Sequence, residues 1–347
     1  KSVMHNFLRR CKPKLRICKP KFMDTAFEVS LVQTLKETRY MAIYRTDHFG
    51  IARKIVSNMT AQSWEEIPHV STEYEADVTD LMAELKEINK KAKSKEEKIT
   101  VNTVMMKVIC EGIKAAPKMN TTLDFKRKLV RGSLHYHDQI DISMPVVLKD
   151  GEMMTVNLHN MGNKTLPEMS AAVADTMRRA DNSDMNQVMY DVSLSNTLQG
   201  LKDGKISQTI YRLLGSKLPG VHMVHSLSGA EKKAYYSIPV KDRLTTHDIE
   251  QGTTTISNFG SIYREQKGMC TLLEIIPPQT TAFAVNAVQD KPIVVKGENG
   301  EKHIEIRQIL PITVAIDHRA LDYGDCIPFF KKLDEIFKNP KILHSWM

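Results

Sequence analysis

Three polar side chains near the C-terminus have the types and spacing of a catalytic group. His318, Arg319 and Asp322 directly follow the apolar run "ILPITVAI", and functional side chains often stand where a buried strand ends. A neutral imidazole there could act as a general base, because the pKa of an imidazole lies close to neutral pH. Asp322 could orient the ring or pair with an arginine. The same residues could equally be an ordinary strand end that turns into a loop.

A second candidate lies earlier in the chain, in the hydroxyl-rich stretch "QGTTTISNFGS" at 251–261. Ser257 or a neighbouring threonine could donate a hydrogen bond to an oxyanion that develops during acyl transfer. The alternative is a threonine-rich strand followed by turn residues.

The elements that must position these side chains alternate unevenly. In the first half we expect a helix from Ile51, a strand over 69–77, a helix capped by Thr79 and another helix from Asn102. "QIDISMPVVL" and "EMMTVNL" flank "KDG", which is typical of a hairpin. Thr165 then caps a third amphipathic helix.

The second half is rich in strands. We expect them in "TTTISNFG", "MCTLLEII", "TAFAVNAV", "KPIVVKG" and "HIEIRQILPITVAI", with a turn at "GENGE". A final helix places Ile327, Phe330 and Phe337 inward. Together the elements predict an α/β fold (α+β, with a mixed sheet) and not a regular parallel Rossmann repeat. No glycine-rich phosphate loop is present.

The predicted organisation is a basic segment at 1–45 and one domain at 46–347, with an insertion at about 183–243. Within the insertion, "ISQTIYRLLGSKLPG" predicts a short helix and "SLSGAEKKAYYSIPV" a loop. Eight of the 49 basic residues lie in residues 1–23, which contain no acidic residue. The other 41 basic residues equal the 41 acidic residues in number, so the rest of the chain is neutral. Such a tail could bind an acidic partner or be a solvated terminus.

The compartment is predicted from two further properties. The five cysteines are scattered and odd in number, which favours a reducing compartment over a disulfide framework. No apolar run approaches the roughly 20 residues that a membrane span needs. We therefore expect a cytoplasmic protein, with the mitochondrial matrix as the alternative.

Taken in order, these segments resemble a known family. "TTTISNFG", "LLEIIPPQTTAFAV" and "LPITVAIDHRALDYGD" are similar to the catalytic domain of dihydrolipoamide acyltransferases, the core component of 2-oxoacid dehydrogenase complexes. Upstream, "ARKIVSNMTAQSWEEIPHV" and "VNTVMMKVICEGIKAAPKMNTTL" continue the likeness. It covers about 51–338, apart from the insertion. The resemblance implies the two-layer chloramphenicol acetyltransferase-like fold.

The resemblance also implies a mechanism. His318 would take a proton from the thiol of CoA or dihydrolipoamide, and Ser257, supported by Asn258, would stabilise the tetrahedral oxyanion. Asp322 would be mainly structural, with an arginine partner for which Arg53 is the candidate. CoA or acyl-CoA is then a substrate, and no metal or redox cofactor is required. The sites would lie between subunits of a homotrimer, or of a larger assembly of trimers, with the histidine and serine from different chains.

Two departures from the family pattern affect this interpretation. The glycine expected after Asp322 is Tyr323, which could change the turn or narrow the pocket. Nothing N-terminal resembles a lipoyl domain, so we expect no lipoyl attachment site in this chain. Either such parts were removed or the enzyme stands alone; we favour a stand-alone enzyme using CoA and a small-molecule or lipoyl acceptor. An inactive trimeric scaffold is the alternative, favoured by Tyr323 and the insertion. The neutral main body gives no support for nucleic-acid binding.

Overall fold

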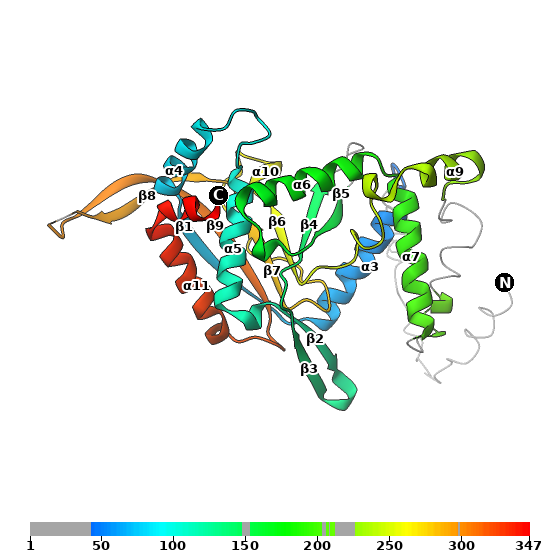
Figure 1. Ribbon diagram of the computed structural model, residues 1–347. Coiled ribbons are helices and arrows are strands. Elements are labelled where there is room, and N and C mark those ends of the chain that lie inside the picture. Colours follow the sequence, from blue (N-terminus) through cyan, green and yellow to red (C-terminus); the bar gives the residue numbers. More distant parts are fainter. Residues whose placement is uncertain (1–42, 148–152, 203–205, 208, 212–225, 298) are drawn as a thin grey trace, which may run out of the picture. The chain divides into compact units, whose positions relative to one another are not determined.

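A mixed β-sheet forms the centre of the unit Phe49–Met347 (Figure 1). The structure, a computed structural model, describes residues 43–347 apart from 148–152, 203–205, 208, 212–225 and 298. The described strands lie in the order β1-β9-β7-β6-β4-β5, and β8 pairs with β9 as a hairpin. Strand β6 is parallel to β4 and β7, while the other pairs are antiparallel. The predicted mixed sheet is therefore confirmed. The strands are β1 (His69–Asp77), β4 (Ile142–Val147), β5 (Met153–Leu158), β6 (Thr254–Asn258), β7 (Thr281–Val285), β8 (Gln289–Lys296) and β9 (Lys302–Asp317).

Helices cover one face of this sheet. They are α4 (Thr79–Lys90), α5 (Val101–Ala115), α6 (Leu166–Asp181) and α11 (Tyr323–Lys338). The last turn of α3 (Ile51–Glu66) instead contacts the 269–276 segment, where Ser63 donates to the Ile275 carbonyl. The ring of Phe329 on α11 lies 5.3 Å from that of Phe283 on β7. Helix α5 approaches α11 closely at Gly112, where a Cβ would stand 2.6 Å from the Phe329 ring. These contacts hold the middle of α11 against β7 and α5.

Two details of the predicted helices are corrected. The buried face of α11 is Cys326, Phe329, Leu333 and Ile336, whereas Ile327 is 40% exposed. Thr79 does not cap α4: it is the first helical residue, and its N–H and hydroxyl donate to Asp77. By contrast, Thr165 does cap α6, in a capping box with Glu168.

Another predicted element, the strand "MCTLLEII", is wrong. Residues 269–276 cross beside the sheet without joining it. Ile275 is fully buried in a small apolar cluster with Ile67, Ala282 and Ala315, and its N–H donates to the His69 ring. Of this run only Ile275 is buried, against the face of the sheet, and Leu272 is exposed.

The predicted insertion contains more helix than expected. Helices α7 (Met185–Lys202) and α9 (Gly229–Ser237) form within it, and α9 replaces the predicted loop. Most of "ISQTIYRLLGSKLPG" lies outside the described residues. No helix among the described residues is long and apolar enough to cross a membrane.

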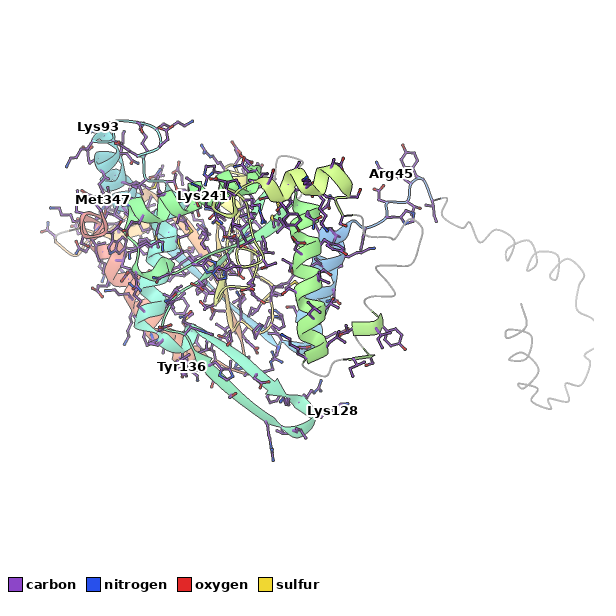
Figure 2. All side chains as sticks on the ribbon, turned by 45° about the vertical axis from the view of Figure 1, so that its right-hand side comes forward. Arg45, Lys93, Lys128, Tyr136, Lys241 and Met347 are labelled. Atoms are coloured by element: carbon purple, nitrogen blue, oxygen red, sulfur yellow. The ribbon has the colours of Figure 1, made fainter. Side chains whose placement is uncertain are left out.

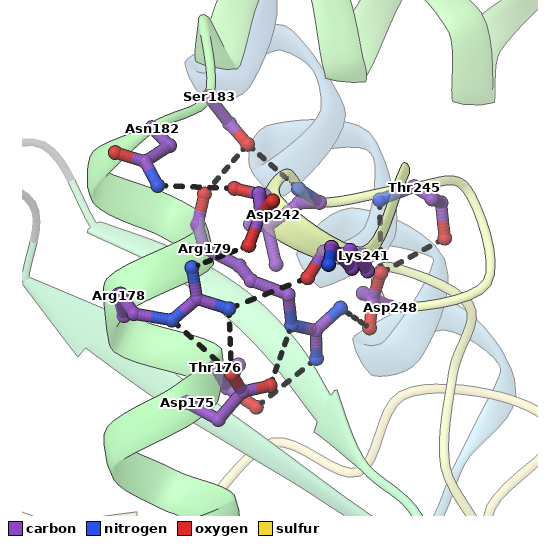
Figure 3. A network of polar contacts seen from close by, with 11 residues as sticks. Asp175, Thr176, Arg178, Arg179, Asn182, Ser183, Lys241, Asp242, Thr245 and Asp248 are labelled. Carbon is purple, nitrogen blue, oxygen red and sulfur yellow. Dashed lines mark hydrogen bonds and ion pairs between the residues drawn. The ribbon is translucent and has the colours of Figure 1, made fainter. Parts of the chain in front are cut away.

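The two ends of the insertion are fastened together (Figure 3). Arg178 pairs with Asp242 at 2.9 Å, and Arg179 pairs with Asp248 at 2.6 Å. The Ser183 hydroxyl accepts from the backbone N–H of Leu244 at 2.7 Å. Because these contacts join the end of α6 to the segment that leads into β6, the inserted chain returns without displacing the strand that carries Ser257.

Candidate active site

His318 lies directly after β9, where the chain leaves the sheet. Its backbone N–H donates to the Pro68 carbonyl at 3.1 Å, and its side chain is 51% exposed. The ring Nδ1 lies 3.1 Å from the carbonyl oxygen of Leu321. A carbonyl oxygen only accepts, so in the neutral ring Nδ1 carries the proton and Nε2 keeps its lone pair. The turn thus fixes the tautomer that a general base needs.

A buried carboxylate, which the sequence prediction missed, anchors this turn. Asp317 is fully buried and accepts from the Arg319 guanidinium at 3.0 Å and 2.7 Å, and from the Arg319 backbone N–H at 2.9 Å. The guanidinium also lies 5.9 Å from the ring centre of Phe125. Two parallel hydrogen bonds from one arginine give a rigid pair. The signal that could have shown it is an acid at the end of an apolar run, two residues before an arginine.

Asp322 has a looser relation to the histidine. Its carboxylate is 82% exposed, and one oxygen lies 3.5 Å from His318 Nδ1. Its backbone N–H donates to the Asp325 carboxylate at 2.9 Å. Asp325 in turn pairs with Lys118 at 2.7 Å, and the hydrogen bond from Asp322, followed by Lys118, lowers the pKa of Asp325. Within one chain Asp322 therefore serves mainly to start α11.

Tyr323 occupies the first position of α11, where any residue can adopt the backbone angles. Among the described non-glycine residues, only Val130 and Asn160 have positive φ, so no glycine is needed at 323. The Tyr323 ring is 56% exposed and its centre lies 5.9 Å from that of Phe330. A tyrosine at 323 is therefore compatible with the turn observed here.

Ser257 lies in β6, between β4 and β7. Its side chain is half-buried, and its hydroxyl makes no hydrogen bond with any residue that the structure describes. Asn258 caps the short helix α10 (Phe259–Ile262) by accepting from the Ser261 N–H at 2.8 Å, and it also donates to Asn102 at the start of α5. Asn258 thus fixes the end of β6 and leaves the serine hydroxyl available.

One chain keeps Ser257 and His318 apart. Ser257 stands opposite Ala284, and Ala284 stands opposite Thr313. Thr313 lies five residues before His318 on β9 and its turn, which is roughly 17 Å along the strand at about 3.3 Å per residue. The two residues therefore cannot act on one reacting carbon within a single chain.

Arg53 is also distant from the histidine. It is exposed near the start of α3, whereas the far end of α3 leads to Pro68 beside His318. Thirteen residues of helix separate Arg53 from Glu66, or about 20 Å. Within this chain Arg53 does not reach Asp322, so their pairing remains a prediction that only a second copy could fulfil.

His69 is a further residue beside this turn. It stands opposite Asp317 at the start of β1, and its Nε2 accepts from the Ile275 N–H at 3.0 Å. Ser63, which lies 3.2 Å from the same nitrogen, donates to the Ile275 carbonyl at 2.7 Å. Burial lowers the pKa of His69, in keeping with a neutral ring that accepts a hydrogen bond. His69 joins α3, β1 and the 269–276 segment.

The fold is shared with solved acyltransferase cores. The dihydrolipoamide acetyltransferase of Azotobacter vinelandii has a TM-score of 0.59 to this chain at 17% identity, over 94% of this chain and 99% of that one. A probable dihydrolipoamide acetyltransferase from Listeria monocytogenes gives 0.58 at 17%, over 86% and 96%. At this identity the likeness shows the fold alone.

The chain belongs to the family of 2-oxoacid dehydrogenase acyltransferases (catalytic domain), whose model matches residues 43–192 and 231–345. The predicted family and enzyme class are therefore confirmed. Residues 193–230, which the model leaves out, fall inside the predicted insertion.

This chain covers only part of the length of the curated relatives that it matches. The acetyltransferase component of the pyruvate dehydrogenase complex of Rickettsia felis is 21% identical over 84% of this chain and 53% of that protein. The mitochondrial succinyltransferase component of the 2-oxoglutarate dehydrogenase complex of Bos taurus is 29% identical over 30% of this chain and 21% of that protein.

Proposed function

We propose that this protein transfers an acyl group between the thioesters of CoA and a dihydrolipoyl thiol, in sites formed between neighbouring copies of the chain. The observation that carries the proposal is the distance between two side chains. His318 has its tautomer set by the hydrogen bond to Leu321, and the hydroxyl of Ser257 has no partner among the described residues. Each is suited to one half of acyl transfer, and a second copy is needed to bring them together.

His318 supplies the base. Its Nε2 takes the proton from the attacking thiol as the sulfur bonds to the thioester carbonyl carbon. The tetrahedral intermediate then collapses, the carbon–sulfur bond of the original thioester breaks, and the departing thiolate takes the proton from the His318 imidazolium. Donation from Nδ1 to Leu321 keeps the ring oriented through both proton transfers.

Ser257 of a neighbouring copy supplies the oxyanion donor. Its hydroxyl makes no hydrogen bond with a described residue of its own chain, so it can donate to the tetrahedral oxygen at no cost to an existing contact. A fixed donor of this kind is worth most when water is excluded. The meeting of two subunits is one way to exclude it.

The assembly follows from the same division. An interface that joins the His318 end of one subunit to the Ser257 end of the next is heterologous, and such an interface forms a ring when the rotation between subunits closes. A homotrimer, free or within a larger assembly, fits this requirement. The cubic core of a pyruvate dehydrogenase complex, which shares the fold with a TM-score of 0.58 at 18% identity, offers a precedent for the larger form.

The inactive-scaffold alternative is weakened by the position of Tyr323. Its backbone is helical and its ring packs toward Phe330, so the substitution does not remove the turn that holds His318. The insertion likewise ends at a closed set of ion pairs and does not displace β6.

The direct test is transfer from acetyl-CoA or succinyl-CoA to free dihydrolipoamide by the purified chain, together with the melting temperature at millimolar CoA. A CoA-dependent rise in melting temperature and formation of acyl-dihydrolipoamide are expected. A protein that neither binds CoA nor transfers either acyl group would contradict the proposal.

A further inference from the structure

Helix α9 lies against the beginning of α7, near the end of α6 (Figures 1 and 2). Between these helices and the chain that returns to the sheet is a cavity of about 230 Å³. Its lining comes from Val188 and Asp191 on α7, Tyr236 on α9, and Val240 and residues 243–246 on the returning chain. Pockets for drug-sized ligands hold roughly 300–1,000 Å³, so this one suits a smaller molecule. We call it the insertion pocket.

The insertion pocket contains an oriented cation. The guanidinium carbon of Arg243 lies 5.3 Å from the ring centre of Tyr235 and 5.2 Å from that of Tyr236, which are favourable distances for a cation over aromatic rings. Its Nε donates to the Ile238 carbonyl at 3.4 Å. Arg243 forms no ion pair with any residue in the described part of the chain. A stacked guanidinium of this kind can offer its edge N–H groups to a carboxylate.

The insertion pocket also contains an oriented carboxylate. One oxygen of Asp191 accepts from the Tyr236 hydroxyl at 2.6 Å, and the other accepts from the Gln187 amide at 2.8 Å. Burial, followed by the hydrogen bond to Asp191, raises the pKa of Tyr236 to about 12, so this hydroxyl is a neutral donor at pH 7. Each carboxylate oxygen can accept a second hydrogen bond. Asp191, too, has no ion pair with a residue that the structure describes.

The two opposite charges share one pocket without neutralising each other. Arg243 and Asp191 both line it, yet no ion pair joins them. A simple anion bound to Arg243 would face the Asp191 carboxylate, and a simple amine bound to Asp191 would face the guanidinium. A ligand that carries both charges side by side can pair with both groups. The buried side chains of Val188 and Leu244 supply an apolar wall beside the charges.

We propose that the insertion pocket binds an α-amino acid with a small apolar side chain. The carboxylate of the ligand accepts from Arg243, its ammonium donates to Asp191, and its side chain packs against Val188 and Leu244. Such a ligand joins α7 to residues 243–246, the segment that leads into β6, and therefore stabilises the folded insertion. This binding does not depend on the acyl-transfer reaction.

The test compares L-leucine with two analogues that each lack one charge. 4-Methylpentanoate has no amino group, and 3-methylbutylamine has no carboxylate. Calorimetry on the whole chain measures their dissociation constants, and thermal unfolding measures stabilisation at millimolar ligand. We expect leucine to bind and to raise the melting temperature, and each analogue to bind about tenfold or more weakly because it loses one charged pair. Absence of leucine binding, or equally tight binding of either analogue, would overturn the proposal.

Two variants locate the binding. Arg243→Gln and Asp191→Asn should each weaken leucine binding by about tenfold or more. The matched control is Arg264→Gln, which removes an exposed arginine outside the insertion pocket and should bind leucine like the wild type. Thermal unfolding without ligand verifies that each variant folds.

The variants should also change the preference between ligands. Arg243→Gln should bind leucine and 3-methylbutylamine about equally, because the carboxylate has lost its partner. Asp191→Asn should bind leucine and 4-methylpentanoate about equally, because the ammonium has lost its partner. Damage to the fold alone would not produce these two opposite patterns. Wild-type leucine affinity in both variants would place the binding elsewhere and contradict the proposal, and the analogue series on the wild-type chain remains decisive if a variant does not fold.

Discussion

The polar side chains at the two ends of the central sheet differ in whether they have hydrogen-bond partners within the chain. At one end, His318 and Asp317 are held by contacts within the same chain: Leu321 fixes the ring and Arg319 fills the buried carboxylate. At the other end, the Ser257 hydroxyl has no described partner. A side chain with its geometry already set suits a base, and a donor left open suits a ligand. We infer from this difference that one chain supplies two parts of different active sites: an oriented histidine at one end and a serine hydroxyl without a described partner at the other.

The largest effect is expected at the His318 end. His318→Ala should lower kcat for acyl transfer by about 10²–10⁴-fold, because a positioned general base contributes that much. The half-exposed ring makes few packing contacts, so the melting temperature and the oligomeric state should stay the same. Steady-state transfer to free dihydrolipoamide measures the first and size-exclusion chromatography the second. A nearly wild-type kcat in this variant would show that His318 is not the general base.

Next comes the buried carboxylate at the same end. Asp317→Asn leaves the Arg319 guanidinium without its ionic partner and should cost about 3–5 kcal/mol of the free energy of unfolding. The exposed Asp322→Asn is the matched control and should cost less than about 0.5 kcal/mol. Urea denaturation of both variants measures the difference. Similar costs for the two would show that burial does not separate their roles.

A smaller effect is expected at the open end. Ser257→Ala should lower kcat by roughly a hundredfold, as removal of one oxyanion donor does, with little change in KM or stability because the hydroxyl has no partner to lose. Initial rates over a range of acetyl-CoA concentrations provide both constants. An increase in KM alone would mean that Ser257 binds substrate without stabilising the oxyanion.

The mildest expected effect is on pH dependence. Burial lowers the pKa of His69 in the folded protein, so the unfolded chain binds a proton at a higher pH than the folded one. The free energy of unfolding should therefore fall as pH drops from about 6.5, the pKa of an unperturbed histidine, through the folded-state value. His69→Gln should reduce this slope between pH 7 and 5 in urea titrations. An unchanged slope would assign it to other groups.

The sequence predicted those elements that leave a local pattern, such as the spacing of apolar residues or a capping box. The helix from Ile51, the strand from His69 and the capping box at Thr165 each have a local physical cause in spacing or side-chain chemistry. The hairpin of β2 (Thr121–Lys126) and β3 (Arg131–Tyr136) was missed although its apolar and polar residues alternate, because each run is only six residues long. Residues 269–276 were misread as a strand because a short apolar run does not by itself show strand pairing: only Ile275 is buried there, and Leu272 is exposed.

The residue types of the candidate site were predictable, and the resemblance also implied that the histidine and the serine come from different chains. His318 and Ser257 came from a resemblance of ordered segments. That they lie far apart in one chain follows from strand register, which the segments themselves do not encode. Asp317 was hidden because a fully buried acid is recognised only once its arginine is seen to fold back onto it. Whether Tyr323 altered the turn depended on its backbone angles.

The most direct test of the central claim is to mix two inactive variants. His318→Ala keeps Ser257, and Ser257→Ala keeps His318. If each site takes its histidine from one copy and its serine from the next, co-assembling equal amounts gives both residues in about a quarter of the sites, since assembly in a ring is random. Activity near a quarter of the wild-type rate is predicted. Activity no greater than the mean of the two separate variants would contradict a site shared between chains.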